Sequence, residues 1–259
     1  IDHLLCPLQF EADWYQARGV SAECVGHPFF DEIHERQLDN AFMSTHVGNV
    51  AKGSPLAGVL PGSRRHEVLN NFPIQLQIAA NLHRQIPGAK FLVACYKQSQ
   101  FEFCRQHLEA SKLELPMELC LGRTPEIIEA ADACLMVSGS VSLELLARNT
   151  PGVVLYHCGP LFYFLGSLMV TCKYMSLPNL IADRPLMPEF IVRGNPAKSI
   201  GEMTNVLGNW LTNPAELQAR RDEMAALARE VVGTGATSRA ADAVLSRLES
   251  PARSVRKAA

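Results

Sequence analysis

The chain has 259 residues, 47% of them apolar and 19% charged, so it can bury a sizeable core and long disordered regions are not expected. The formal net charge of -2 gives no electrostatic footprint for nucleic acid, and no apolar run is long enough to span a bilayer. The 8 cysteines form no Cys-x-x-Cys pair and have no metal-ligand spacing. They therefore favour free, buried thiols in a reducing compartment over a disulfide framework or a zinc site.

Short apolar runs alternate with helical patterns along most of the chain. The runs predict strands at residues 3–8, 22–25, 56–60, 90–94, 117–121, 133–137 and 153–156. The helical patterns cover residues 11–17, a stretch that ends near residue 85 and is interrupted near Pro73, and residues 99–110, 125–130, 142–148, 196–211, 214–231 and 236–248. This alternation predicts an α/β fold with a parallel sheet and helices on both of its faces.

The loop after the strand predicted at 56–60 carries groups that suit a phosphate. Gly62 allows a backbone to approach a ligand closely, and Ser63 can cap the next helix and donate to a phosphate oxygen. Arg64 offers a fork of donors to a diphosphate and can stabilise the charge on a departing one. Ligands of open parallel sheets bind beyond the carboxyl ends of the strands, so this loop is a candidate site. A Pro-Gly turn with solvated arginines is the alternative.

Two further loops follow predicted strands. The backbone at Gly122 and Arg123 can hydrogen-bond the edge of a base. Ser138-Gly139-Ser140 opens a helix whose free N–H groups suit an anion, and Glu144 lies one turn further on, where it can accept a sugar hydroxyl. A strand-to-helix turn with Thr124 as N-cap explains the first loop equally well, and an ordinary turn with Ser as N-cap is the simpler explanation of the second loop taken alone.

Two later stretches also have alternative interpretations. Asn179, which follows Pro178, offers donors and an acceptor and can hold a phosphate, or it belongs to a Pro-Asn turn between two elements. The apolar run at 161–170 can contact acyl chains or a membrane surface, or form a core helix.

Four motifs in one order closely resemble the lipid-A-disaccharide synthase family. They are Val25-Gly26-His27-Pro28, Leu60-Pro61-Gly62-Ser63-Arg64 with Glu67, Ser138-Gly139-Ser140-Val141-Ser142-Leu143-Glu144, and Ser176-Leu177-Pro178-Asn179 with Pro188-Glu189. Each motif is short, but the four together are specific, and the resemblance runs from residue 1 to about residue 248.

The resemblance implies an inverting glycosyltransferase with two Rossmann-like domains, the GT-B fold. Such an enzyme transfers 2,3-diacylglucosamine from its UDP conjugate to 2,3-diacylglucosamine 1-phosphate and needs no metal or other cofactor. It implies catalytic roles for Arg64 and Asn179 at the diphosphate, a ribose contact for Glu144 and a phosphate contact for Ser140. The full set of expected UDP-binding residues is Gly62, Ser63, Arg64, Gly122, Arg123, Ser138, Gly139, Ser140, Glu144 and Asn179.

The family's amino-terminal half, which carries a Gly-Glu-x-Ser-Gly-Asp motif and the candidate general base, does not match any part of this sequence. Residues 1–35 are therefore expected to be the end of the amino-terminal, acceptor-binding domain. A linker at 36–54, a nucleotide-sugar-binding domain at 55–213, carboxyl-terminal helices at 214–250 and a disordered tail at 251–259 complete the predicted organisation. The segment is not expected to be catalytically competent alone.

Two alternatives stay open. One is another UDP-sugar GT-B enzyme, such as a peptidoglycan N-acetylglucosaminyltransferase or a UDP-sugar 2-epimerase; the other is a UDP-binding module without catalysis. The expected partners are the two acylated sugars and no nucleic acid, with a membrane surface and a second copy of the chain left open. The expected location is the cytoplasm, with peripheral attachment to the inner membrane left open.

Overall fold

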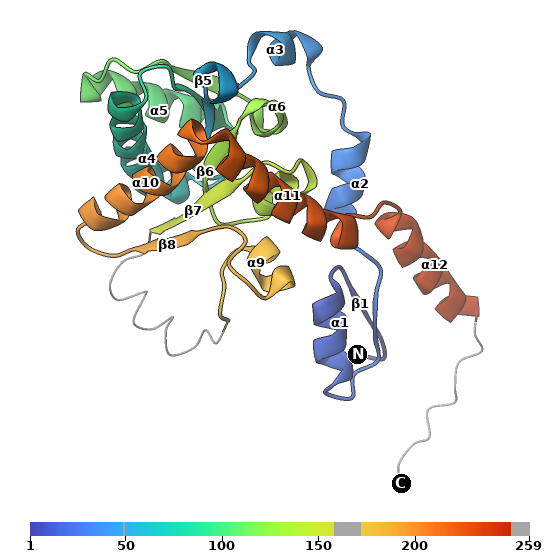
Figure 1. The fold of residues 1–259 in the computed structure, drawn as a ribbon. Helices are drawn as coiled ribbons and strands as arrows, with labels where there is room; N and C mark the ends of the chain where they lie inside the picture. The colour runs from blue at the N-terminus through green and yellow to red at the C-terminus, as the bar shows by residue number, and fades with distance from the viewer. Residues whose placement is uncertain (49, 158–171, 250–259) are drawn as a thin grey trace. The chain divides into compact units, whose positions relative to one another are not determined.

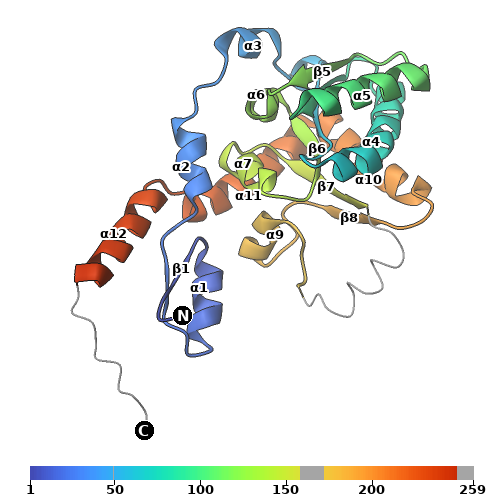
Figure 2. The same cartoon turned by 180° about the vertical axis from the view of Figure 1, so that it is seen from behind.

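The computed structural model describes residues 1–48, 50–157 and 172–249 (Figures 1 and 2). The chain forms two compact units, one from residues 1–36 with the segment from 229 onwards, the other from residues 37–228. In the part of the chain that is described, no helix has the length and apolar character needed to cross a bilayer.

The larger unit is built on a six-stranded parallel sheet in the order β5-β4-β3-β6-β7-β8. The strands are β3 (Leu56–Leu60), β4 (Lys90–Cys95), β5 (Met117–Leu121), β6 (Ala133–Val137), β7 (Gly152–His157) and β8 (Glu189–Val192). Every residue of β3 and β6 is buried, which is why these strands read as unbroken apolar runs in the sequence. Gly58 allows them to pack closely, because a Cβ there would lie 2.6 Å from the Cys134 sulfur.

Helices cover both faces of this sheet, as Figures 1 and 2 show. On one face α4 contacts α5 and α10, and on the other α7 contacts α6 and α9. The helices of this unit are α3 (Asn40–Thr45), α4 (Arg65–Gln85), α5 (Gln98–Ser111), α6 (Thr124–Ala130), α7 (Val141–Ala147), α9 (Leu177–Ala182), α10 (Ala197–Thr212) and α11 (Pro214–Val231), which runs into the smaller unit. The predicted α/β architecture with helices on both faces is therefore confirmed.

The smaller unit contains one parallel β-α-β arrangement of the Rossmann-like kind. Strands β1 (Leu4–Cys6) and β2 (Ala22–Cys24) are parallel and joined through α1 (Gln9–Gln16). Helices α2 (Pro28–Glu35) and α12 (Ala236–Glu249) belong to the same unit. Asp31 of α2 accepts hydrogen bonds from the Gly235 and Thr237 N–H groups, so its carboxylate caps α12.

The structure differs from the sequence-based expectations at several points. Helix α4 runs through Pro73 without interruption, because the burial of Phe72, Ile74 and Ile78 on either side of the proline outweighs the lost N–H donor. Helix α3 and a 3₁₀ turn (Val50–Lys52) lie within the segment expected to be a linker. Each of the seven cysteines in the described ranges is free, but Cys172, which was expected to be buried, is exposed. The apolar run at 161–170 and the tail at 251–259 lie outside the described residues.

Candidate functional site

The strand order places two of the predicted loops next to each other. Strands β3 and β6 are neighbours, and Leu60 pairs with Met136. The chain continues from β3 to β4 and β5 on one side of this pair, and from β6 to β7 and β8 on the other side, so the strand order reverses between β3 and β6. This reversal is the point in an open α/β sheet where ligands bind beyond the strand ends. The loop from 61 to 64 and the loop from 138 to 140 both leave the sheet there.

Glu67 organises the loop between β3 and α4. Its Oε2 accepts the N–H groups of Ser63 and Arg64 at 2.9 and 3.0 Å, and its Oε1 lies 2.9 Å from Arg64 Nη1. Gly62 has φ +112, and a Cβ there would lie 2.6 Å from Glu67 Cβ, so glycine is required both by conformation and by space. The Arg64 side chain is 73% exposed, so its guanidinium remains accessible to a ligand.

The loop between β6 and α7 presents small exposed residues to solvent. Gly139 and Ser140 are exposed, and the Ser140 hydroxyl makes no capping bond to the helix. Ser138 Oγ donates to the Met175 carbonyl at 3.1 Å, and Ser142 Oγ donates to the Gly139 carbonyl at 2.7 Å. The expected phosphate contact of Ser140 stays a prediction that this exposure allows.

Glu144 is buried and ion-paired. It is 3% exposed, and its Oε1 lies 3.2 Å from Arg148 Nε, while Arg148 Nη1 reaches Glu129 at 2.9 Å. A carboxylate in this environment depends on such a partner, because an isolated buried charge is costly. The ribose contact of Glu144 stays a prediction.

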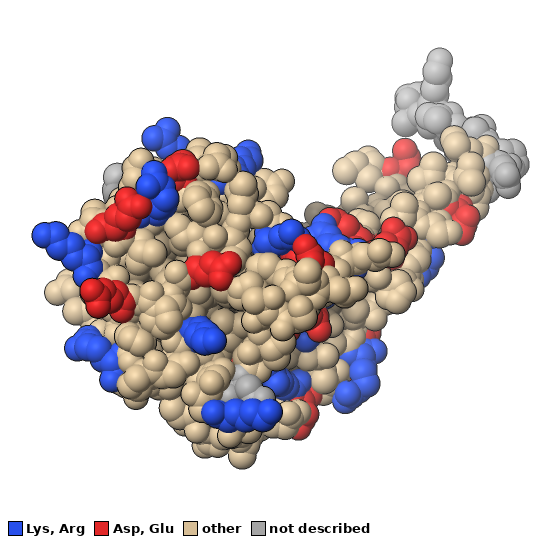
Figure 3. All heavy atoms as spheres, turned by 90° about the horizontal axis from the view of Figure 1, so that it is seen from above, with Lys and Arg blue, Asp and Glu red and all other residues tan. Residues whose placement is uncertain are grey.

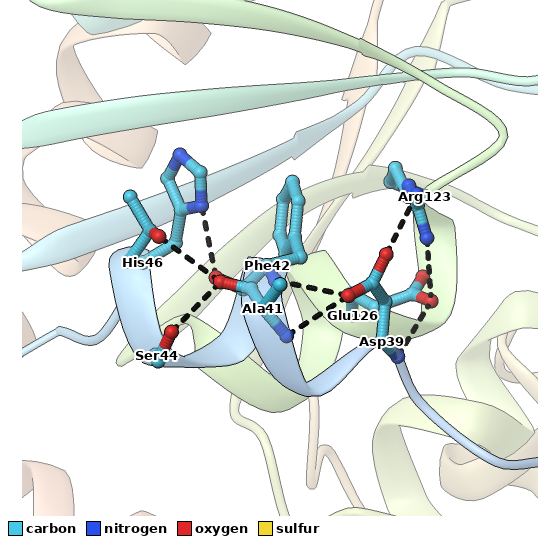
Figure 4. Close-up of polar contacts among 8 residues, drawn as sticks. Asp39, Ala41, Phe42, Ser44, His46, Arg123 and Glu126 are labelled. Atoms are coloured by element: carbon cyan, nitrogen blue, oxygen red, sulfur yellow. Dashed lines mark hydrogen bonds and ion pairs between the residues drawn. The ribbon is translucent and has the colours of Figure 1, made fainter.

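Arg123 forms ion pairs with two carboxylates, one of them at the start of α3 (Figure 4). Arg123 Nη2 lies 2.8 Å from Asp39 Oδ2 and its Nη1 lies 3.4 Å from Glu126 Oε1. Asp39 Oδ1 also accepts the N–H groups of Ala41 and Phe42 at the start of α3. The capping bond from Phe42 and the nearby guanidinium lower the pKa of Asp39. Arg123 therefore anchors α3, and its predicted contact with UDP stays a prediction.

Gly122 also has an internal role. It has φ +69, and its N–H donates to the Cys95 carbonyl at 2.8 Å, which continues the ladder between β5 and β4. The Gly122 N–H is therefore already used within the sheet. The predicted contact with the edge of a base would have to come from other backbone groups of this loop.

Asn179 is hydrogen-bonded through its side chain inside the fold. Its side chain is fully buried; Nδ2 donates to the Met187 carbonyl at 2.7 Å and to Glu189 Oε1 at 2.8 Å, and Oδ1 accepts the Met187 N–H. Glu189 also accepts the Ser176 N–H and hydroxyl, at the start of α9. Asn179 and Glu189 thus tie α9 to β8, and contact between this amide and a diphosphate would require one of these bonds to break.

Three residues that organise the loops were assigned no function from the sequence, although two of them, Glu67 and Glu189, stand in the motifs that carry the family resemblance. They are Glu67, Glu189 and Gln100, whose Nε2 donates to the Ser63 carbonyl at 2.7 Å. Only Glu67 and Gln100 have a local signal, since each occupies the third position of its helix, where a side chain can reach back to the turn.

The surroundings of these loops add two observations. A groove of about 520 Å³ lies between the amino-terminal parts of α4 and α5, with Val68, Leu69 and Phe103 in its lining, and contains none of the predicted UDP-binding residues. On the face drawn in Figure 3, acidic and basic side chains are interspersed. Within the described ranges, no group of three or more His, Cys, Asp and Glu residues could hold a metal ion.

The comparison with protein families decides where this chain belongs. The family model described as lipid-A-disaccharide synthetase matches residues 1–238. The chain belongs to the lipid-A-disaccharide synthetase family. A curated relative, the lipid-A-disaccharide synthase of Pseudomonas putida (strain GB-1), is 32% identical over 248 residues, which are 96% of this chain and 63% of that protein. The chain therefore spans less than two thirds of the length of this relative.

Solved structures with the same fold are distant in sequence from this member of the lipid-A-disaccharide synthetase family. A protein of Listeria monocytogenes described as a UDP-N-acetylglucosamine 2-epimerase has a TM-score of 0.63 at 14% identity, covering 95% of this chain and 58% of that one. TarM of S. aureus, in a structure that contains UDP, has a TM-score of 0.54 at 12% identity, covering 95% of this chain and 43% of that one. These similarities establish the GT-B type of fold alone.

Proposed function

We propose that this chain binds the UDP-linked donor in the synthesis of the lipid A disaccharide. In this reaction 2,3-diacylglucosamine passes from its UDP conjugate to 2,3-diacylglucosamine 1-phosphate. The observation that carries the proposal is the family match over residues 1–238. The adjoining loops of β3 and β6 support it, because they lie where open α/β sheets bind nucleotides.

The reaction is a direct displacement at the anomeric carbon of the donor. The oxygen of the acceptor's 6-hydroxyl forms the new bond, the bond between the anomeric carbon and the diphosphate breaks, and UDP leaves with the electron pair. The hydroxyl proton passes to a base that we place on the amino-terminal half of the family, outside this chain. Arg64, whose guanidinium is largely exposed beside the strand ends, is our candidate for stabilising the charge that develops on the β-phosphate.

The remaining partners are part of the same proposal. The acceptor is an acylated glucosamine 1-phosphate. Because both sugars carry acyl chains, we place the reaction at the cytoplasmic surface of the inner membrane. A second copy of the chain as a partner stays a prediction. The alternative function is a UDP-binding module without catalysis.

Titration of UDP into the chain by calorimetry tests the donor site. We expect binding by the unaltered chain, a large loss of affinity in Arg64→Ala, and little change in the control Arg65→Ala, which removes the same charge from the next residue. No binding by the unaltered chain contradicts the proposal.

A chimera tests the reaction itself. The chain joined to the amino-terminal half of a curated relative should form the disaccharide from both sugar substrates, and Arg64→Ala should lower turnover by about 100-fold, as expected for a lost charge-stabilising donor. UDP binding without turnover in the chimera favours the module.

A further inference from the structure

Gln100 links the ends of two neighbouring strands through one buried amide. It is 5% exposed and is the third residue of α5. Its Oε1 accepts the N–H groups of Tyr96 and Lys97, at 2.9 and 3.3 Å, just beyond β4. Its Nε2 donates to the Ser63 carbonyl at 2.7 Å, just beyond β3.

This donor bond completes the restraint on one peptide group. The carbonyl of the Ser63–Arg64 peptide accepts from Gln100, and the N–H of the same peptide donates to Glu67 at 3.0 Å. Ser63 and Arg64 are themselves exposed, so packing does not fix them. These two hydrogen bonds therefore restrain the orientation of this peptide, and with it the starting point of the Arg64 side chain. The Arg64 carbonyl also accepts the Glu67 and Val68 N–H groups.

Capping of α5 does not explain why the side chain is an amide. A glutamate at the third position of a helix satisfies the free N–H groups at the helix start as well as a glutamine does. Only the amide also supplies a donor, and that donor is used on the loop of another strand rather than on α5.

We propose that Gln100 is a positioning residue for the diphosphate site, which fixes the Ser63–Arg64 peptide so that Arg64 is held ready for the donor before it binds. The inference rests on the proposed function, because it assigns Gln100 a role at the proposed UDP site. Holding the loop in advance removes an ordering cost that UDP binding would otherwise carry.

Gln100→Glu tests this role, because it keeps the acceptor for Tyr96 and Lys97 and removes the donor to Ser63. At pH 8 we expect the Kd for UDP to rise about tenfold, the effect of losing one hydrogen bond from a prepared site. Hydrogen exchange at the amides of Ser63 and Arg64 should also become faster. Gln106→Glu, the same substitution at an exposed position of α5, is the matched control and should leave both measurements unchanged.

The UDP affinity of Gln100→Glu as a function of pH separates a positioning role from a role limited to capping α5. If Gln100 only capped α5, this affinity relative to the unaltered chain would not change with pH. A protonated carboxyl group regains an O–H donor, so UDP affinity relative to the unaltered chain at the same pH should recover as the pH falls. Gln100→Met, which is similar in size and uncharged, covers the case in which the acidic variant does not fold. Because it also removes the acceptor for Tyr96 and Lys97, it should show at least the same loss of UDP affinity and at least as fast an exchange, without the recovery at low pH.

The outcomes separate this inference from the proposed function. If the unaltered chain binds UDP but Gln100→Glu keeps both its UDP affinity and its slow exchange, the positioning role is overturned and the UDP site stands. An equal loss of affinity in Gln106→Glu also overturns it. No UDP binding by the unaltered chain overturns the proposed function and this inference together.

Discussion

Arg64 and Glu67 form an ion pair one turn apart at the start of α4, with 2.9 Å between Nη1 and Oε1. The second carboxylate oxygen of Glu67 accepts the N–H groups of Ser63 and Arg64, so a carboxylate already occupies backbone donors that would suit a phosphate. An anion that binds these N–H groups must displace Glu67. An anion that binds the exposed guanidinium of Arg64 does not need to.

Replacing Glu67 should destabilise the larger unit without disrupting its core. Glu67→Ala leaves the Ser63 and Arg64 N–H groups without their partner, and we expect the free energy of unfolding to fall by about 1 kcal/mol, as for a lost helix cap. Glu67→Gln keeps an acceptor and should cost less. Urea unfolding measures both, with Glu109→Ala on the exposed side of α5 as the control. Equal losses in Glu67→Ala and the control would argue against the capping role.

Asn179→Ala should act on stability as well as on any ligand. The substitution removes the partner of the Met187 N–H and carbonyl and of Glu189, all within a fully buried amide network. Buried groups left without partners cost free energy, and we expect a loss of about 3 kcal/mol in urea unfolding. If Asn179 instead contacts the diphosphate as its main role, UDP affinity will fall while the unfolding free energy stays near that of the unaltered chain.

Arg148→Met should be strongly destabilising, because it removes an ion-pair partner from the buried carboxylate of Glu144. Breaking a buried pair costs far more than breaking an exposed one, and we expect a loss of about 3 kcal/mol. Glu129→Gln, which removes the more exposed partner of Arg148, should cost under about 1 kcal/mol. The double variant Glu144→Gln/Arg148→Met should recover part of the loss. A double variant less stable than Arg148→Met would show that the lost ion pair with Glu144 is not the cause.

Three strands, β3, β5 and β6, have the bounds that the sequence predicts. In β3 and β6 every residue is buried, and two covered faces produce an unbroken apolar run, whereas in β5 only Cys120 is buried. Helix α3 has no buried residue, so its sequence carries no apolar periodicity, although Asp39 caps it. The start of α9 is capped by Glu189, which accepts the Ser176 N–H and lies several residues after the end of the helix. No local sequence pattern predicts such a contact.

The candidate site shows the same limit. The position of Gly62 and Arg64 at a strand end could be predicted from the sequence, because a strand end followed by a turn and a helix has a recognisable local pattern. The ion pair between Arg123 and Asp39 and the hydrogen bond from Asn179 to Met187 could not be predicted from the sequence, because each joins segments that only the fold brings together. A side chain's chemistry can thus be read from the sequence, but whether the fold leaves it free for a ligand cannot.

The capping of α12 by Asp31 makes the smaller unit sensitive to acid. Hydrogen bonds, first of all from the Thr237 N–H, lower the pKa of Asp31 below its ordinary value of 3.8. A carboxylate with a lowered folded-state pKa stabilises the fold above its unfolded pKa, and this contribution is lost as the pH falls through the lower value of the folded state. Asp31→Asn should therefore lower stability at pH 7, and its deficit should shrink as the pH falls below 3.8 and the unaltered chain is protonated.

Urea unfolding from pH 7 to pH 2.5, followed by a fluorophore attached to the smaller unit, measures this convergence. Asp242→Asn is the matched control, because it removes the same charge from an exposed position on α12 itself. Its effect should be small at every pH, since Asp31 and not the net charge of the helix holds the N–H groups of Gly235 and Thr237. A difference between Asp31→Asn and the unaltered chain that stays constant over the whole pH range would mean that the ionised carboxylate is not what stabilises α12.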